Sequence, residues 1–256
     1  MNLAVRVSAL DVWFGARQIL HGVDFVAQQR SITVLAGRSG SGKTTLLRSL
    51  NRLNETFAGC RTRGHIELDL GQGLEDVLGP SARPLTEIRR RVGMVFQTPD
   101  VLPVSIARNI GLPLRVVAGV AAGEIADRVE SALKAVGLWQ EVADRLDNPA
   151  ASLSGGQQQR LCLARVLALE PAVLLLDEPT ASLDVQAAHE IERLLFSLGE
   201  NYPLVVVSHS PEQAVRLASR LVVFEAGRVC HEFSAGGVDA AGLAAMLEHD
   251  RAQQNP

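Results

Sequence analysis

In this 256-residue sequence, a glycine-rich segment near the amino terminus gives the strongest indication of a chemical function. The pattern GxxxxGK[ST] is matched by Gly37, Arg38, Ser39, Gly40, Ser41, Gly42, Lys43 and Thr44, and Thr45 follows it. Glycines let the backbone fold around phosphate groups, so that amide N–H groups and the positive end of the next helix face anionic oxygens. In this pattern Lys43 can reach the β- and γ-phosphates of a nucleotide, and the Thr44 hydroxyl can ligate Mg²⁺. The segment therefore predicts a nucleoside-triphosphate site.

Two acids stand at the end of an apolar run later in the chain. Residues 173–176 are Val-Leu-Leu-Leu, and Asp177 and Glu178 follow them. Such a run predicts a buried strand, and α/β proteins place ligands at the carboxyl ends of their parallel strands. One acid can hold Mg²⁺, usually through water, and the other can orient or deprotonate a hydrolytic water. Together with the glycine-rich segment, the pair points to hydrolysis of the bound nucleotide.

A strand and a helix must position the glycine-rich segment. Residues 31–36 are strongly apolar and end at Gly37, and leucines recur at helical spacing over residues 43–53. Strand, glycine loop and helix is the arrangement that such a phosphate site needs. Residues 3–36 alternate apolar and polar positions in short runs, which predicts antiparallel strands.

The remaining chain predicts a sheet and a helical block. Residues 65–70 resemble a strand, and residues 71–84 resemble an exposed loop. Within residues 105–147, apolar residues recur at three- and four-residue steps, which predicts a helical block. We expect this block to be a subdomain, at about 103–168, inserted in the larger domain. After Pro149 the pattern predicts alternating helices and strands: helix 156–169, strand 172–176, helix 186–198, strand 203–207, helix 211–218 and strand 220–224. Residues 226–256 resemble a short strand pair followed by a terminal helix from about Val238. Alternating helices and apolar strands imply a parallel sheet covered on both faces.

Composition excludes several function classes. With Lys+Arg 25 against Asp+Glu 28 and a net charge of −3, the chain has no global electrostatic grip on nucleic acid. The run Arg89, Arg90, Arg91 predicts a solvated or ion-pairing face. The 3 cysteines lie far apart without metal-ligand spacing, so we expect reduced thiols in a cytosolic protein. The amino terminus lacks a signal-peptide core, and no stretch approaches the roughly 18 apolar residues of a membrane span.

A third motif, LSGGQ at residues 153–157, lies between the two nucleotide motifs. Ser154 is suited to cap a helix, and a helix N-terminus attracts anions. Here the sequence resembles the ATP-binding cassette (ABC) family, whose LSGGQ signature lies in the same order. The resemblance covers about residues 3–233 and leaves 234–256 as a C-terminal helical tail. It implies an α/β P-loop NTPase fold with a mostly parallel core sheet, an antiparallel β subdomain and an inserted α-helical subdomain.

Other family elements follow in order along the chain. Phe14 resembles the aromatic residue that stacks on adenine, and Gln97 resembles the glutamine of the Q-loop. Asp184 resembles the D-loop aspartate. His209 resembles the switch histidine, although a lone histidine after an apolar strand would ordinarily be a satisfied core residue.

The resemblance implies a mechanism that needs two copies of the chain. Packed head to tail, the signature residues of one copy would contact the γ-phosphate held by Lys43 of the other. These signature residues are Ser154, Gly155, Gly156 and Gln157. Hydrolysis would use Glu178 as general base, with His209 and Gln97 sensing the γ-phosphate and water. Mg²⁺ would be held by Thr44, Asp177 and Gln97.

Within the family, a single cassette without a membrane span resembles the separate ATPase subunit of an importer. Residues 47–55, 91–110 and 153–165 look most like the phosphate-import ATPase, whereas Thr98 and Val185 stand where those proteins usually have a proline-rich segment and a proline. The implied partners are transmembrane permease subunits and, indirectly, a solute-binding protein, with no nucleic acid. The implied location is the cytoplasm, on the inner face of the cell membrane.

Other interpretations of the same motifs predict a different solute or a different class of nucleotide-binding protein. The transported solute could be another compound, such as an amino acid, a metal or an oxyanion. A P-loop kinase or GTPase would share residues 37–44 but has no reason to carry LSGGQ, and no NKxD guanine motif is present. A soluble, non-transport cassette ATPase usually has two cassettes or a long coiled-coil insertion. A non-catalytic module would have a broken acid pair, and here Glu178 is intact.

Overall fold

The computed structural model describes residues 2–253 of the chain. Its strands are β1 (Leu3–Phe14), β2 (Arg17–Gln28), β3 (Ile32–Gly37), β4 (Cys60–Asp69), β5 (Leu74–Asp76), β6 (Val92–Val95), β7 (Val173–Asp177), β8 (Leu204–Val207), β9 (Arg220–Glu225) and β10 (Arg228–Ser234). Its α-helices are α1 (Lys43–Leu50), α2 (Leu85–Arg91), α3 (Ile106–Val116), α4 (Ile125–Ala135), α5 (Trp139–Val142), α6 (Gly155–Leu167), α7 (Val185–Gly199), α8 (Pro211–Leu217) and α9 (Ala240–Gln253). Short 3₁₀ helices are η1 (Leu53–Thr56), η2 (Ala122–Glu124) and η3 (Ala150–Ser152).

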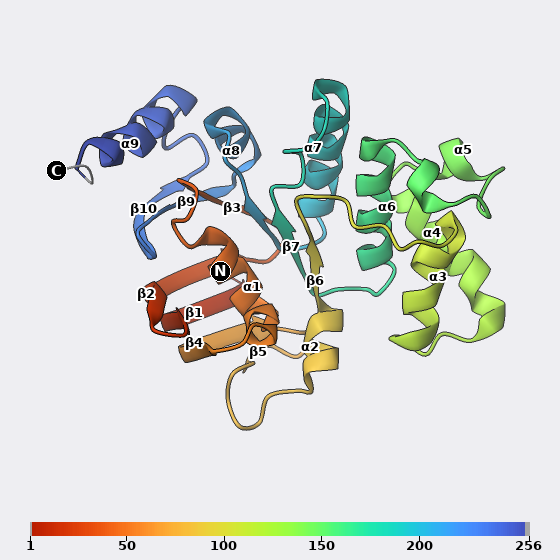
Figure 1. The fold of residues 1–256 in the computed structure, drawn as a ribbon, viewed down its shortest axis with the longest axis horizontal. Coiled ribbons are helices and arrows are strands. Elements are labelled where there is room, and N and C mark those ends of the chain that lie inside the picture. Colours follow the sequence, from red (N-terminus) through yellow and green to blue (C-terminus); the bar gives the residue numbers. More distant parts are fainter. Residues whose placement is uncertain (1, 254–256) are drawn as a thin grey trace.

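Two sheets of different kind organise these elements (Figure 1). The antiparallel sheet has the strand order β2-β1-β4-β5. The larger sheet has the order β10-β9-β3-β8-β7-β6, and its pairs are parallel except for β9 and β10. Parallel neighbours place the carboxyl ends of β3, β7 and β8 along one edge, which is where the nucleotide motifs follow in the sequence.

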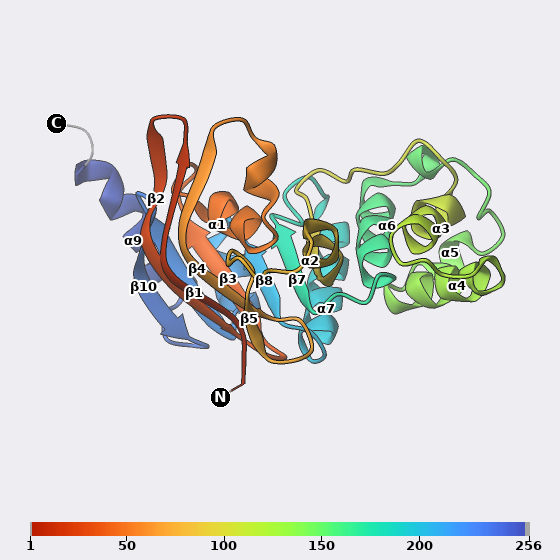
Figure 2. The ribbon, with the colours of Figure 1, turned by 90° about the horizontal axis from the view of Figure 1, so that it is seen from below.

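Both faces of the central strands β3, β7 and β8 are buried. Because side chains alternate along a strand, each face can be assigned to the helices that cover it. In β7, Val173 and Leu175 belong to an apolar cluster with α1 and the antiparallel sheet. Leu174 and Leu176 belong to a second cluster with α6, α7 and α8. Helices α1 and α6 therefore cover opposite faces of the sheet, as Figure 2 also shows.

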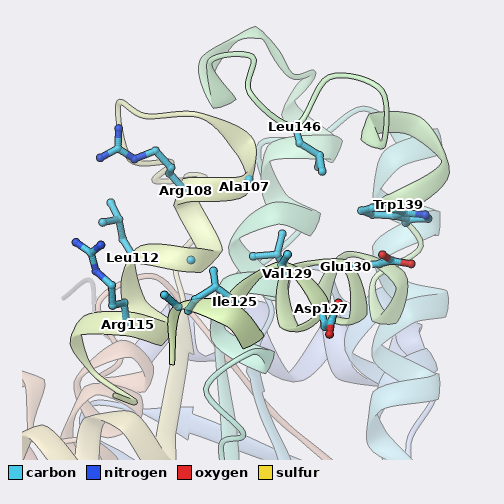
Figure 3. A pocket seen from close by; sticks show the side chains of 13 residues that line it. Ala107, Arg108, Leu112, Arg115, Ile125, Asp127, Val129, Glu130, Trp139 and Leu146 are labelled. Atoms are coloured by element: carbon cyan, nitrogen blue, oxygen red, sulfur yellow. The ribbon is translucent and has the colours of Figure 1, made fainter. Parts of the chain in front are cut away.

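Helices α3, α4 and α5 form a lobe beside α6 at one end of the molecule (Figures 1 and 2). Their buried residues join the same cluster as the nearby sheet face, so the lobe and the sheet share a core. An apolar pocket of about 510 Å³ lies in this lobe, with Leu112, Ile125, Val129 and Trp139 in its wall (Figure 3). The residues predicted for the nucleotide site are not among its lining residues, which fall between 107 and 146.

The expectation of antiparallel strands over residues 3–36 is confirmed for β1 and β2 and is wrong for β3. β3 pairs in parallel with β8 and β9, in the centre of the larger sheet. All six residues of β3 are buried. A strand buried on both faces cannot show the apolar and polar alternation of an antiparallel strand with one solvated face.

The C-terminal region also differs from its prediction. Residues after Ala226 contribute one strand, β10, rather than a strand pair, because β10 takes the preceding β9 as its antiparallel partner. Since β10 ends at Ser234, the predicted boundary at 233/234 falls inside a strand. Helix α9 begins at Ala240, and Leu243 is fully buried in the cluster beside α8. The last predicted residues, 254–256, lie outside the described residues.

The arginine run ends α2 and serves the fold. Arg89 donates a hydrogen bond to the carbonyl of Arg52, and Arg91 donates to the carbonyls of Leu70 and Glu170. These bonds tie α2 to three other segments, rather than leaving the run as a solvated or ion-paired face. Cys60, Cys162 and Cys230, all within the described residues, form no disulfide bond. Over residues 2–253, no helix has the length and apolar character needed to cross a membrane.

Candidate nucleotide site

The glycine-rich loop joins β3 to α1, and its backbone explains its glycines. Gly37 has φ +147°, and a Cβ there would lie 2.3 Å from the carbonyl oxygen of Phe224. Gly42 has φ +106°, and its Cβ would lie 2.8 Å from Leu20 Cδ2. Only glycine combines these left-handed conformations with so close an approach. The loop is therefore held between β9 and β2 in a shape that other residues cannot adopt.

Lys43 folds back into this loop from the first turn of α1. Its Nζ lies 2.7 Å from the carbonyl oxygens of both Gly37 and Arg38, and the residue is only 4% exposed. Burial lowers the pKa of the ammonium to about 8, against a partial rise from the carboxylates of Asp177 and Glu178. The structure thus places one desolvated cation in the centre of the loop.

The N-terminus of α1 keeps its amide donors free of side chains. Its N-cap is Gly42, which offers no side-chain hydrogen bond, and the first turn has no acidic residue. The first N–H groups of an α-helix have no partner within the helix. Together with the helix dipole they favour an anion. This helix end and Lys43 can hold the phosphates of a nucleotide.

Thr44 and Asp177 bring together oxygen atoms suited to Mg²⁺. The Thr44 hydroxyl donates to Asp177 Oδ1 at 2.9 Å, and Arg48 lies 4.0 Å from Asp177 Oδ2. Hydroxyl and carboxylate oxygens are ligands that Mg²⁺ takes in proteins, usually together with water and substrate phosphates. No group of three or more His, Cys, Asp or Glu that could hold a metal occurs within residues 2–253. The residues present therefore fit an ion that shares its coordination with a nucleotide.

Glu178 and His209 meet at the same edge of the sheet. Glu178 follows β7 and His209 follows β8, and these strands are parallel neighbours. Glu178 Oε1 lies 2.6 Å from His209 Nε2, and the Glu178 amide donates to the carbonyl of Val207. The two side chains are 15% and 39% exposed, so water can reach both. A carboxylate in such a position can orient a water molecule and accept its proton.

The signature segment begins α6. Ser154 is the N-cap, and it exchanges hydrogen bonds with Gln157: the Gln157 amide donates to the Ser154 hydroxyl at 3.3 Å, and the Ser154 amide donates to Gln157 Oε1 at 3.0 Å. A Cβ on Gly156 would lie 2.8 Å from that of Ala187, so this glycine allows α6 to approach α7. Gly155 is exposed. The segment therefore lies on the α6 side of the sheet, opposite to α1.

Comparison with known proteins decides the family. Residues 20–181 match the family model described as ABC transporter. The chain belongs to the ABC transporter family. Its ligands are therefore ATP and Mg²⁺, and its function is that of an ABC ATPase subunit of a transporter.

Two solved structures support the ABC fold. CbiO1 from Clostridium perfringens, described as part of the ABC transporter complex cbiONQ, aligns with 100% of this chain and 96% of its own, with a TM-score of 0.77 and 24% identity. The ATP-binding cassette MJ0796, in a dimeric post-hydrolysis state bound to ADP and Pi, aligns with 91% of this chain and 100% of its own, with a TM-score of 0.74 and 28% identity. The expected fold class is confirmed.

The segments that carry two further predicted motif residues, Gln97 and Asp184, contact each other in the structure. The Ser182 hydroxyl donates to the main-chain carbonyl of Gln97 at 3.2 Å, so the predicted Q-loop contacts the predicted D-loop. The Gln97 residue is exposed. Asp184 is the N-cap of α7 and accepts a hydrogen bond from the Ala187 amide at 2.9 Å. The carboxylate of Asp184 thus caps the N-terminus of α7.

Phe14 ends β1, and a second aromatic residue packs against it. The ring of Phe57 meets the Phe14 ring edge to face, with centroids 6.0 Å apart. Phe57 follows η1, and the Asn54 side chain ties that helix to the Thr45 carbonyl of α1. Sequence reasoning missed Phe57. Its only signal was an aromatic residue in the short connection after the phosphate-binding helix.

Sequence reasoning also missed a polar cluster that contacts the loops of Glu178 and His209. Its central residue is Gln213, on α8, four residues after His209. The available signal was a glutamine four residues after His209. Nothing in the sequence indicated that the loops after β7 and β8 would both contact its side chain.

Proposed function

We propose that this chain is the ATP-hydrolysing subunit of an ABC importer, with Glu178 as general base. The observation that carries the proposal is the contact between Glu178 and His209, on the edge where Lys43, Thr44 and Asp177 also lie. A base, a polar partner and a phosphate-binding loop on one edge are the parts that hydrolysis of a γ-phosphate requires.

The proposed roles divide between binding and chemistry. The phosphates are held by Gly37, Arg38, Ser39, Gly40, Ser41, Gly42, Lys43, Thr44 and Thr45. Thr44, Asp177 and Gln97 hold Mg²⁺, which neutralises charge on the β- and γ-phosphate oxygens when bound. Phe14 stacks on adenine, Glu178 accepts the proton of the attacking water, and His209 and Gln97 contact the γ-phosphate and that water.

The proposed assembly is a head-to-tail dimer. In this dimer Ser154, Gly155, Gly156 and Gln157 would serve a nucleotide on another copy, and the location of α1 and α6 on opposite faces of the sheet supports this proposal. The dimeric state of MJ0796, at 28% identity, supports this assembly. ATP would shift the chain toward the closed dimer because it binds that state more tightly than the open one.

The proposed partners are transmembrane permease subunits on the inner face of the cell membrane, with a solute-binding protein contacting them from outside. In this arrangement residues 103–168 form the helical subdomain of a nucleotide-binding domain at 3–233. Inorganic phosphate is the proposed solute, supported by the resemblance of residues 47–55, 91–110 and 153–165. The description of CbiO1 as part of cbiONQ makes another solute the competing proposal.

Uptake measurements test the proposal in the host. Depletion of the chain should reduce high-affinity phosphate uptake at limiting external phosphate, and wild type but not Glu178→Gln should restore it. Unchanged phosphate uptake, in cells that express no second phosphate importer, would reject phosphate as the solute. The transported solute would then be identified through the permease that co-purifies with the Glu178→Gln variant. Rescue of uptake by Glu178→Gln would reject the catalytic role of Glu178.

A further inference from the structure

A polar cluster with a buried centre contacts the loops that carry Glu178 and His209. It consists of Thr180, Glu192, Ser208, Gln213 and Arg216, which we call the Gln213 cluster. Gln213 is 8% exposed, Glu192 6% and Ser208 2%. Thr180 is partly buried, and Arg216 is exposed at the edge of the cluster. The three buried polar residues are stable there only when their polar atoms are hydrogen-bonded.

The Gln213 amide joins the two loops through hydrogen bonds. Its Oε1 accepts from the Ser208 hydroxyl at 2.7 Å. Its Nε2 donates to Thr180 Oγ1 at 2.6 Å and to Glu192 Oε1 at 3.0 Å. One side chain therefore contacts the loop after β7, the loop after β8 and helix α7.

Glu192 determines which way this amide points. A carboxylate can only accept hydrogen bonds, so the NH₂ group of Gln213 must face Glu192 and the amide oxygen must face Ser208. Arg216 donates two hydrogen bonds to Glu192, at 2.9 and 2.7 Å. Burial alone would raise the pKa of the Glu192 carboxyl, but the hydrogen bonds from Arg216 and Gln213 outweigh it and the pKa is lowered. The acceptor that orients the amide thus stays ionised.

The two loop contacts lie next to the reacting groups. Thr180 is two residues after Glu178, and Ser208 immediately precedes His209. We propose that Gln213 is a positioning residue, whose amide keeps the loops of Glu178 and His209 at the spacing that hydrolysis needs. This inference rests on the catalytic roles proposed for those two residues.

The decisive variant is Gln213→Met, which keeps the length of the side chain and removes its hydrogen bonds. We expect the kcat for ATP hydrolysis to fall about tenfold, whereas the KM for ATP changes less than twofold, because the phosphate-binding loop lies elsewhere on the sheet edge. Gln213→Glu should also lower kcat, since it places a second carboxylate against Glu192.

A matched control separates positioning from general stability. Leu217→Val shortens a buried apolar side chain of the same helix, with Leu217 only 2% exposed, and leaves the Gln213 cluster intact. The control should lower the melting temperature and leave kcat within twofold. The ¹⁵N NMR shifts of the His209 ring should move in Gln213→Met and stay constant in Leu217→Val.

The same assays include Glu178→Gln and His209→Ala, so that two kinds of failure are distinguishable. If both of these keep the wild-type rate, the catalytic roles are wrong and the inference falls with them. If both lose activity while Gln213→Met keeps its kcat and its His209 shifts, the positioning role alone is rejected. Equal losses of kcat in Gln213→Met and Leu217→Val would likewise reject it.

Discussion

The N-termini of α1 and α6 both carry phosphate-related motifs, yet they are built in opposite ways. Helix α1 starts at Gly42 without any side-chain cap. Helix α6 starts at Ser154 with a complete capping box, in which Ser154 and Gln157 satisfy each other's amides. A capping box satisfies donors that a helix start otherwise leaves free.

This difference agrees with the proposal that the α1 end binds ATP within one chain, whereas the α6 end acts on a partner's nucleotide. At α1 the free amides and buried Lys43 form a concentrated positive site within one chain. At α6 the capping box already uses the amides of Ser154 and Gln157. The helix start still offers the Ser154 hydroxyl and the exposed backbone of Gly155. The second end is suited to complete a site rather than to create one.

The largest expected effect separates hydrolysis from binding at α1. Glu178→Gln should lower kcat by at least about 100-fold, because it removes the proposed general base. The Kd for ATP should change less than threefold, since the α1 end is intact. Single-turnover hydrolysis and calorimetric titration measure the two quantities. Light scattering should show an ATP-dependent dimer of the variant, and a monomer in saturating Mg-ATP would contradict the head-to-tail model.

Lys43→Ala should remove most of the binding strength of the α1 end. Charge-assisted hydrogen bonds to phosphate contribute about 1.5–3 kcal/mol, so the Kd for ATP should rise about 10- to 150-fold. Calorimetric titration gives this value. Arg48 lies on the same helix, 4.0 Å from Asp177, so Arg48→Met is a matched control that also removes a cation. It should raise the Kd for ATP less than Lys43→Ala does. Unchanged affinity in Lys43→Ala would contradict the role of the loop.

Lys43 also predicts a pH dependence of ATP affinity. Because burial lowers its pKa to about 8, the free protein loses this charge as the pH rises through that value. If bound phosphate keeps Lys43 protonated, the Kd should rise about tenfold between pH 7 and pH 9. Calorimetric titration across this range checks the slope. In Lys43→Arg the slope should vanish because arginine stays protonated, and a flat wild-type profile would show that Lys43 does not titrate with binding.

Ser154→Ala tests the α6 end. Loss of the N-cap should lower the free energy of unfolding by about 1 kcal/mol and leave the Kd of the monomer for ATP unchanged. In the Glu178→Gln background it should also weaken the ATP-dependent dimer. Ser105→Ala removes the equivalent cap of α3 and should match the loss of stability without affecting the dimer. If the two variants dimerise equally well, Ser154 acts only as a cap.

Phe57→Ala should have the smallest effect. An aromatic pair contributes about 0.5–1.5 kcal/mol, so loss of its edge contact with Phe14 should weaken ATP binding about threefold. Inorganic triphosphate has no base, and its affinity should not change. Phe14→Ala, measured beside it, should weaken ATP more strongly. A parallel loss for triphosphate would mean that Phe57 supports the phosphate loop instead of the adenine.

Local chemistry made much of the site predictable. The glycines of residues 37–42 and the acids at 177–178 follow apolar strands, and this order alone predicts a common sheet edge. Contacts between distant segments were not predictable in this way. The Phe14 and Phe57 pair joins the end of β1 to the connection between α1 and β4. The Gln213 cluster joins two loops and two helices.

By itself, the sequence determined the phosphate loop, the acid pair, the Ser154 cap and the alternation of helices and strands, because each depends on residues close together in the chain. Only the tertiary structure decided that β3 is a central parallel strand, that α1 and α6 cover opposite faces, and that Glu178 meets His209 at 2.6 Å. The physical reason is that strand pairing and side-chain packing bring residues together irrespective of their separation in sequence.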